Sequence, residues 1–313
     1  MPLHGLLMYA GCSGYVRRLH QQHSFNCIDA HYVFPDGLAA VLLGRSLGIP
    51  VVLSARGSDI HTFPRFRTIR PQIRWALRNA AGVVAVSDSL ARAIHELEPA
   101  LKNVQVIGNG VDAQRFYRED RSLARERLGL SPGGKVVVSV AALRRVKGPD
   151  LLVGAASLLK KSLPHCKVLF VGAGPELAPL QELAKQLSCA DICQFVGPVA
   201  NQQLRTYFSA ADVSCLTSRE EGWPNVILES LACGTPVVAT CVGAVPQLLT
   251  DPALGIVVEP SPEAIGAALS RALHQEWNPQ VISSYAKSHT WENVAHKFEE
   301  LIKNVAPLFY TPQ

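Results

Sequence analysis

Glu221 and Glu229 lie eight residues apart, on either side of the position where a helix is expected to begin. The apolar stretch 213–216 before them is typical of a buried parallel strand, Gly222 frees the backbone after it, and Pro224 suits the first position of a helix. The amides at such a helix start bind anions, most often phosphates. Carboxylates accept hydrogen bonds from hydroxyl groups instead. Two carboxylates beside an anion site therefore predict a ligand in which sugars flank a phosphate, namely a nucleotide sugar.

The alternative for this pair is structural: Glu221 would only compensate the helix dipole, and Glu229 would be a solvated helix residue. The sequence that follows favours a binding site, because a helix closed by a glycine leads directly into another apolar strand. The whole run resembles the nucleotide-sugar segment of the retaining glycosyltransferases of family 4, in which a Glu, seven residues, a second Glu and a CGTPVVA strand occur in this order. The resemblance implies that Glu221 positions hydroxyls of the donor sugar and that Glu229 binds the ribose.

Strands and helices alternate along the chain, which indicates parallel sheets with helices on their faces. The expected helices of the first series are 36–47 and 71–79. The expected strands are 49–54, 82–87 and 104–107 in the first series, and 135–140, 167–172, 192–197, 213–217, 236–240 and 255–258 in the second. The fold class is therefore α/β, with two doubly wound, Rossmann-like domains.

A turn-rich piece at 108–112, followed by a charged run, separates the two series of elements. We place an N-terminal, acceptor-side domain at 1–114 and a C-terminal, nucleotide-sugar-binding domain at 115–285. The remaining segment, 286–313, contains the helix 291–305, whose apolar residues fall on one face. In the family that the chain resembles, the two domains form the GT-B fold and such a helix returns across the N-terminal domain.

Three cations follow the first strand of the C-terminal domain. Arg144, Arg145 and Lys147 lie directly before a glycine, at the same sheet edge as the Glu221 loop, and could neutralise a pyrophosphate. The alternative is a solvated basic turn. The run resembles the phosphate-binding loop of the family, except that Ala142 stands where many members have an arginine, which Arg144 or Arg145 would replace.

Gly172 and Gly174 form a turn between a strand and a helix, which suits close approach of a ligand to the backbone. The third glycine of a dinucleotide fingerprint is missing, since Leu177 stands there, and no ribose-binding acid ends the next strand. A dehydrogenase is therefore disfavoured. The loop at Val196 corresponds to the backbone on which the base stacks in the resembled family. The predicted donor-binding residues are Arg144, Arg145, Lys147, Gly172, Gly174, Val196, Gly222, Trp223, Pro224, Asn225, Val226 and Glu229.

The N-terminal domain has two motifs at the expected carboxyl edge of its sheet. His-Tyr-x-x-Pro-Asp-Gly begins at His31, and Arg-Gly-Ser-Asp-Ile begins at Arg56. Both are similar to pieces of teichuronic acid and related surface-polysaccharide transferases of the family, although many members have a histidine in place of Arg56. Two such edges facing each other would form a cleft. The resemblance implies that His31 and Glu221 are catalytic, whereas the structural alternative makes His31 an ordinary satisfied histidine. The predicted acceptor-side residues are Asp36, Arg56, Gly57, Ser58, Asp59, which also suits a helix cap, and Asn109.

Several classes of site are disfavoured by what the sequence contains. The 313 residues include 48% apolar residues and carry a net charge of +5, which suits two domains with their own cores. Eight cysteines are scattered, and the close pair Cys189 and Cys193 lacks the other ligands of a zinc site. An Asp-x-Asp sequence is also missing, so we expect neither a metal nor another cofactor, and leaving-group charge would be stabilised by helix amides and loop cations.

The densest basic stretch contains aromatic residues as well. It could bind anionic lipid headgroups or a lipid-linked pyrophosphate, or it could be a solvated helix face. No recognisable nucleic-acid module accompanies it, so nucleic acid is not an expected partner. The sequence shows neither a transmembrane run nor a signal peptide, so we expect a cytoplasmic protein, with peripheral attachment to the inner face of the plasma membrane as an option. The stretch comprises Phe63, Arg65, Phe66, Arg67, Arg70, Arg74, Trp75 and Arg78.

The opening strand and glycine-rich loop of the family do not occur in residues 1–26, which supply at most one helix. We therefore expect an incomplete N-terminal sheet, from a misplaced start, a fragment, or a protein that works without these parts. The predicted function is a hexosyltransferase-type enzyme that moves a sugar from a nucleotide sugar, expected to be a UDP-sugar, to a glycan or lipid-linked glycan. The resemblance implies retention of configuration and a role in surface-polysaccharide biosynthesis. The alternatives are a catalytically dead or regulatory nucleotide-sugar-binding remnant and a sugar-nucleotide epimerase.

Overall fold

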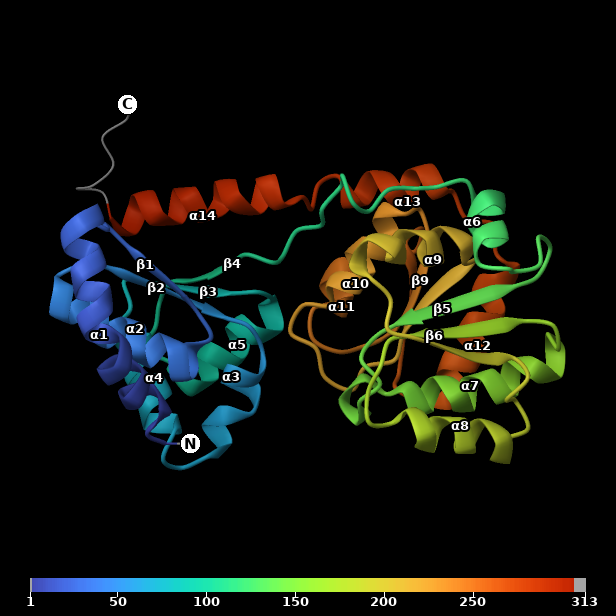
Figure 1. Ribbon diagram of the computed structural model, residues 1–313, viewed down its shortest axis with the longest axis horizontal. Coiled ribbons are helices and arrows are strands. Elements are labelled where there is room, and N and C mark those ends of the chain that lie inside the picture. Colours follow the sequence, from blue (N-terminus) through green and yellow to red (C-terminus); the bar gives the residue numbers. More distant parts are fainter. Residues whose placement is uncertain (1, 307–313) are drawn as a thin grey trace. The chain divides into compact units, whose positions relative to one another are not determined.

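A computed structural model describes residues 2–306 of the chain (Figure 1). The chain divides into two units, one made of Met1–Asn109 with Glu292–Gln313 and the other of Gly110–Trp291. The boundary predicted between residues 114 and 115 lies shortly after Asn109. None of the helices in the described part is both long and apolar enough to span a membrane.

The first unit contains, among the described residues, a parallel sheet of four strands in the order β1-β2-β3-β4. Every residue of β2 is buried, as expected for a run rich in β-branched side chains that is covered on both faces. The strands are β1 (Ile28–His31), β2 (Val51–Ala55), β3 (Gly82–Ala85) and β4 (Val104–Val106). The helical segments are α1 (His4–His23), η1 (Val33–Gly37), α2 (Leu38–Leu47), α3 (Ser58–His61), η2 (Phe63–Arg65), α4 (Arg70–Asn79), α5 (Asp88–Leu97) and α14 (Trp291–Val305).

Helix α14 comes last among the described elements but packs against the sheet of the first unit (Figure 1). Its Leu301 is buried with Val52 of β2 and Val84 of β3, and Phe298 packs against the same cluster. These contacts use the apolar face expected from the spacing of residues in this helix.

The second unit contains, within the described chain, a parallel sheet of six strands in the order β10-β9-β8-β5-β6-β7. The strands are β5 (Val136–Val140), β6 (Lys167–Val171), β7 (Cys193–Gly197), β8 (Val213–Leu216), β9 (Val237–Thr240) and β10 (Gly255–Val258). The helical segments are α6 (Arg121–Arg127), η3 (Arg145–Lys147), α7 (Pro149–Ser162), α8 (Leu177–Gln186), η4 (Asn201–Gln203), α9 (Leu204–Ala210), α10 (Asn225–Ala232), α11 (Val245–Leu248), α12 (Pro262–His274) and α13 (Pro279–Ala286). The predicted α/β class with parallel sheets is confirmed.

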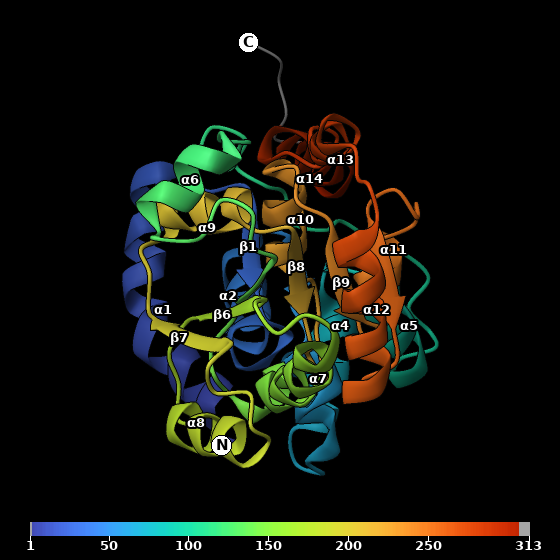
Figure 2. The ribbon, with the colours of Figure 1, turned by 90° about the vertical axis from the view of Figure 1, so that its right-hand side faces the viewer.

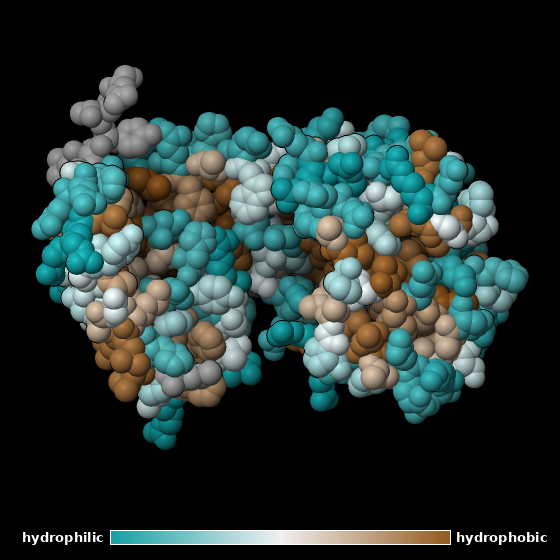
Figure 3. Space-filling model, viewed as in Figure 1, coloured by the Kyte–Doolittle hydropathy of each residue, from teal (hydrophilic) through white to brown (hydrophobic). Residues whose placement is uncertain are grey.

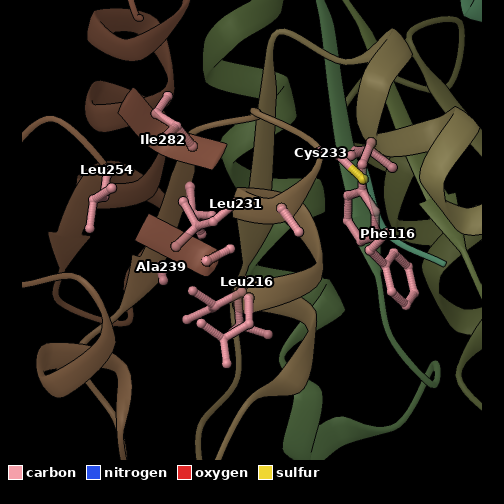
Figure 4. Close-up of a cluster of buried hydrophobic side chains, with 14 of the residues drawn as sticks. Phe116, Leu216, Leu231, Cys233, Ala239, Leu254 and Ile282 are labelled. Carbon is pink, nitrogen blue, oxygen red and sulfur yellow. The ribbon is translucent and has the colours of Figure 1, made fainter. Parts of the chain in front are cut away.

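Helices cover both faces of this second sheet. Alternate residues of β5 enter different cores: Val136 and Val138 join one cluster, and Val137 joins the other, because side chains alternate across a strand. The first cluster contains residues of α9, α10 and α13, and Figure 4 shows some of its members. The second contains residues of α7, α8 and α12, which lie on the other side of the sheet (Figure 2).

The strand order creates a switch point beside β5. Its neighbours are β8 on one side and β6 on the other, so the chain leaves the carboxyl ends of β5 and β8 toward opposite sides of the sheet. Ligands of open α/β sheets bind in the crevice formed at such a point. A ligand site of this unit is therefore expected at the loops that follow β5 and β8.

The eight cysteines are free, and five of them are buried. Burial raises the pKa of the Cys166 thiol to about 12 and also raises that of Cys189. These thiols behave as small apolar core residues. Cys189 and Cys193 are both buried, with their sulfur atoms 4.0 Å apart. Among the described residues, no group of three or more His, Cys, Asp or Glu is placed to hold a metal ion.

Candidate functional site

Glu221 pairs with a cation at the switch point of the second unit. Lys147 Nζ, in the loop after β5, donates to Glu221 Oε1 at 2.6 Å, and Ser218 Oγ donates to the same oxygen at 2.6 Å. The Glu221 side chain is only 8% exposed. Its second oxygen, Oε2, accepts no hydrogen bond within residues 2–306 and is therefore the one that a hydroxyl of a ligand could use.

The backbones of the two loops are in close contact, which explains why Lys147 and Glu221 meet. Gly148 has φ +60°, and a Cβ placed on it would lie 2.0 Å from the carbonyl oxygen of Thr217, so only glycine fits there. The Thr217 hydroxyl donates to the Lys147 carbonyl at 3.2 Å.

Arg219 reinforces this junction. Its Nη1 and Nη2 donate to the two carboxylate oxygens of Asp150 at 2.8 and 2.6 Å, and Nη1 also donates to the Arg145 carbonyl at 2.8 Å. The hydrogen bond from Arg219 lowers the pKa of Asp150. We did not single out Ser218, Arg219 or Asp150 from the sequence, because only the sheet order brings positions near 150 and 219 together.

The predicted loop cations have different surroundings. Lys147 is paired with Glu221, whereas the side chains of Arg144 and Arg145 are exposed. Within the described part of the chain, neither guanidinium has a hydrogen-bond or ion-pair partner. A bound pyrophosphate would therefore meet one cation that already has a counter-ion and two that are free to move toward it.

Gly172 and Gly174 lie where a side chain does not fit. A Cβ on Gly172 would lie 2.0 Å from the carbonyl oxygen of Ala141, and one on Gly174 would lie 2.2 Å from that of Leu143. On the Cβ side, the backbone after β5 therefore packs directly against both glycines. The Gly172 amide donates to the Gly197 carbonyl at 2.8 Å, which holds this loop beside the end of β7, where Val196 lies.

The start of α10 differs by one residue from the prediction. Pro224 is the N-cap with extended backbone, and the helix begins at Asn225, so Pro224 does not occupy the first helical position. Gly222 and Val226 are half-buried. Trp223 packs against the core, and its indole Nε1 is a buried donor without a partner in the described structure. An unpaired buried donor is costly, typically about 1–3 kcal/mol.

Glu229 lies one turn into α10 and is half-buried. Burial raises its pKa from the ordinary 4.5 to about 7, and the charge of Arg115 opposes this rise. Its carboxylate has no hydrogen-bond or ion-pair partner within residues 2–306. A carboxylate with a strongly raised pKa and no partner is typical of a functional site. This property belongs to Glu229 and could not be read from the sequence.

The first unit contains a separate hydrogen-bonded cluster at the ends of its strands. Arg56 donates to His31 Nδ1 and, at 2.7 Å, to the Asn109 side chain. His31 Nε2 lies 3.0 Å from Asp29 Oδ2. Because a guanidinium only donates, Nδ1 accepts and the ring hydrogen is on Nε2, where it faces Asp29. The structure thus brings His31, Arg56 and Asn109 together and adds Asp29, which we did not predict.

Asp59 has a structural role, although it is not the N-cap that the sequence suggested, because α3 begins at Ser58 with Gly57 as its N-cap. It is fully buried and accepts from the amides of Gly57 at 2.7 Å, Val33 at 2.9 Å and Arg56 at 3.1 Å. Burial raises the pKa of its carboxyl, and these amides oppose the rise. The predicted direct contact with an acceptor is wrong for this conformation, and Asp59 instead holds the loop that carries Arg56. Gly57 is buried as well, whereas Ser58 is exposed and Asp36 is half-buried.

Substitution of Gly148 tests the junction between the two loops. We expect Gly148→Ala to lower the free energy of unfolding by about 2–4 kcal/mol, because the new Cβ requires a left-handed backbone and meets the Thr217 carbonyl. Urea unfolding of the full chain measures this difference. Gly133→Ala is the control, since nothing lies within 4 Å of a Cβ at that position. Equal stability of the two variants would contradict the close packing of the loops.

Glu229 makes the free energy of unfolding depend on pH. Because its pKa rises from 4.5 to about 7 on folding, the stability that its protonated form contributes is full below pH 4.5 and is lost as the pH rises to about 7. Each pKa unit corresponds to about 1.36 kcal/mol. The free energy of unfolding of Glu229→Gln, relative to that of the unsubstituted protein, should therefore increase by about 2–3 kcal/mol from pH 5 to pH 8. Urea unfolding at both pH values checks this. Glu220, an exposed glutamate in the loop before α10, should show no such gain when it is replaced by Gln.

Comparisons with known proteins agree with this arrangement. Residues 120–289 match the family model of glycosyl transferases group 1, and residues 2–115 match that of Glycosyltransferase Family 4. The N-acetyl-alpha-D-glucosaminyl L-malate synthase of Bacillus anthracis is 26% identical in an alignment that covers 91% of this chain and 76% of the relative. The teichuronic acid biosynthesis glycosyltransferase TuaC of Bacillus subtilis is 32% identical in an alignment that covers 81% of this chain and 63% of the relative.

A solved structure shows the same fold. HepE from Anabaena, in complex with UDP, aligns with a TM-score of 0.80 at 20% identity and covers 93% of this chain and 82% of its own. The group 1 model alone matches more than half of the chain, and its matched residues include the Glu221 loop, the Lys147 loop and Glu229. The chain therefore belongs to the group 1 glycosyltransferases.

Proposed function

We propose that the protein binds a nucleotide sugar through its second unit and transfers the sugar to an acceptor hydroxyl. The observation that carries this proposal is the half-buried Glu229 carboxylate, which has no partner in the described residues and lies on the helix that starts after the Glu221 loop. A nucleoside diphosphate sugar would supply ribose hydroxyls to Glu229 and sugar hydroxyls to Glu221 Oε2. A UDP-sugar is the proposed donor, supported by the UDP in the HepE structure.

The charge of the leaving diphosphate would be stabilised electrostatically. The amides at the start of α10 point out of the helix, Lys147 lies at the same sheet edge, and Arg144 and Arg145 are exposed beside it. Such preorganised donors and cations act on charge that develops as the sugar–phosphate bond breaks. We propose that these groups suffice and that transfer needs no metal ion.

Retention follows if the acceptor attacks from the side of the leaving group. The bond from the anomeric carbon to the phosphate oxygen breaks through an oxocarbenium-like state, and the acceptor oxygen bonds to the same face. The acceptor proton then passes to the departing phosphate oxygen. His31 stays our proposed second catalytic residue, and the cluster that it forms with Asp29 and Arg56 sets the orientation of its ring.

The proposed acceptor is a glycan or a lipid-linked glycan of surface-polysaccharide biosynthesis, used on the cytoplasmic side of the membrane. The support for this acceptor is the teichuronic acid pathway in the name of TuaC. A protein that binds nucleotide sugars but releases no nucleotide with any acceptor would instead fit a regulatory remnant, and interconversion of two UDP-sugars without acceptor would fit an epimerase.

Calorimetric titration with a panel of UDP-, GDP- and ADP-sugars tests donor binding. We expect one class to bind, and Glu229→Gln to weaken that binding by about 10- to 100-fold, because hydrogen bonds to a charged carboxylate contribute about 1.5–3 kcal/mol. Glu220→Gln is the matched control, since this neighbouring carboxylate is exposed. If no nucleotide sugar binds, or if Glu229→Gln binds as tightly as the unsubstituted protein, the proposal fails.

Chelation tests the proposed independence from metal ions. Transfer assayed with the donor found in the panel should keep its rate in EDTA, because the developing charge meets amides and cations of the chain. Arg144→Gln combined with Arg145→Gln should lower the rate instead. A rate that falls in EDTA and returns with added Mg²⁺ would show that the loop cations do not stabilise the leaving group alone.

A further inference from the structure

The first half of α1 exposes several large apolar side chains. Leu3 is 60% exposed, Leu6 47% and Leu7 64%. On the opposite side of the helix Gly5 is buried against Leu38 of α2, so the start of α1 packs on the unit at Gly5 and turns these leucines outward. Residues three and four positions apart share a helix face, and these leucines therefore form one apolar strip.

An apolar groove continues this strip onto the neighbouring helices. It has a volume of about 320 Å³. A hydrogen bond of 3.0 Å from Gln72 Nε2 to the Pro2 carbonyl joins the start of α1 to α4 beside it. Figure 3 shows a hydrophobic patch over the part of the first unit where Figure 1 places the beginning of α1. The groove is lined by Leu6, Leu38, Leu42, Pro71, Gln72 and Trp75.

Three arginines lie on the segment that leads into α4 and at its first residue, directly before Pro71 of the groove. Arg65, Arg67 and Arg70 are exposed and have no ion-pair or hydrogen-bond partner in the described part of the chain. Phe66, among them, is 49% exposed. We call Leu3, Leu6, Leu7, Phe66 and these three arginines the α1–α4 surface.

The remaining arginines of the basic stretch are not available for a ligand. Arg74 and Arg78 both pair with Glu98, at 3.0 and 2.8 Å, and the Glu98 side chain is only 2% exposed. They lower the pKa of Glu98 and stabilise the packing of α4 against the end of α5. The five arginines that look equivalent in the sequence thus divide into three free charges and two structural ones.

The charges around the α1–α4 surface have one sign. Neither α1 nor the segment 63–78 contains an Asp or Glu, whereas α1 adds Arg17 and Arg18, which are also exposed. A second copy of the same surface would bring like charges together. A membrane with anionic lipids can bind both the leucines and the arginines of the surface. The leucine side chains enter below its headgroups, and its phosphates attract the arginines.

We propose that the α1–α4 surface docks the first unit on a membrane that contains anionic lipid. The leucines of α1 enter the headgroup and acyl boundary, and Arg65, Arg67 and Arg70 pair with lipid phosphates. This inference specifies where the proposed lipid-side acceptor is met, but none of its residues belongs to the Glu221, Glu229 and Lys147 site. Membrane docking and donor binding can therefore fail independently.

Vesicle flotation of the full chain tests the proposal. We expect binding to vesicles of phosphatidylcholine with phosphatidylglycerol, and binding on the order of 100-fold weaker to phosphatidylcholine alone or at high salt, since each arginine near an anionic surface contributes about fivefold. Arg65→Gln, Arg67→Gln and Arg70→Gln combined should lose the same factor. Leu3→Glu with Leu7→Glu should abolish flotation.

The controls are Leu123→Glu, at a position that is 52% exposed on α6, and Arg92→Gln, an exposed arginine on α5. Both should float like the unsubstituted protein, and circular dichroism should show every variant folded. Equal binding to neutral vesicles, or unchanged flotation of the leucine and arginine variants, would overturn the proposal. Two further results would also overturn it. One is a concentration-dependent dimer that Leu7→Glu dissociates, without any binding to vesicles, and the other is binding of an acidic protein but not of lipid. Nucleotide-sugar titration of the same samples reports separately on the donor site.

Discussion

The junction between the loops that follow β5 and β8 is the constraint on which the candidate site depends. These loops leave neighbouring strands toward opposite sides of the sheet, and they stay in contact because Gly148 has no side chain and because Arg219 binds Asp150 through both terminal nitrogens. Lys147 reaches Glu221 only in this arrangement. One backbone contact therefore determines whether the carboxylate at the switch point has a counter-ion.

Glu221 and Glu229, which the sequence suggests as a pair, lie in different environments. Glu221 accepts two hydrogen bonds, one from a cation, whereas Glu229 has no hydrogen-bond or ion-pair partner among the described residues and burial raises its pKa to about 7. Environments that differ in this way give similar groups different roles. A ligand with hydroxyls would give Glu229 the hydrogen-bond donors that it lacks among the described residues, and it would use the second oxygen of Glu221 beside Lys147 and Ser218.

In the first unit, the structure separates charges that hold the fold from charges that remain free. Asp59 is occupied by three backbone amides, and Glu98 by Arg74 and Arg78. His31 and Arg56 stay partly exposed at the ends of their strands, and Arg65, Arg67 and Arg70 lie beside the apolar strip of α1. The unit thus presents one polar cluster at its sheet edge and one cationic, apolar surface on its helices.

The sequence by itself determined the α/β class, most strands and the order of the motifs, because hydrophobic periodicity, glycine and proline act over short distances. It also led to Glu221, Glu229 and Lys147, whose residue types fit the chemistry. Only the tertiary structure decided which partners each charge has. Asp150 and Arg219, or His31 and Arg56, meet through strand order and not through spacing along the chain. The same reason explains the wrong prediction for Asp59. Its burial depends on packing between distant segments, as does the burial that raises the pKa of Glu229.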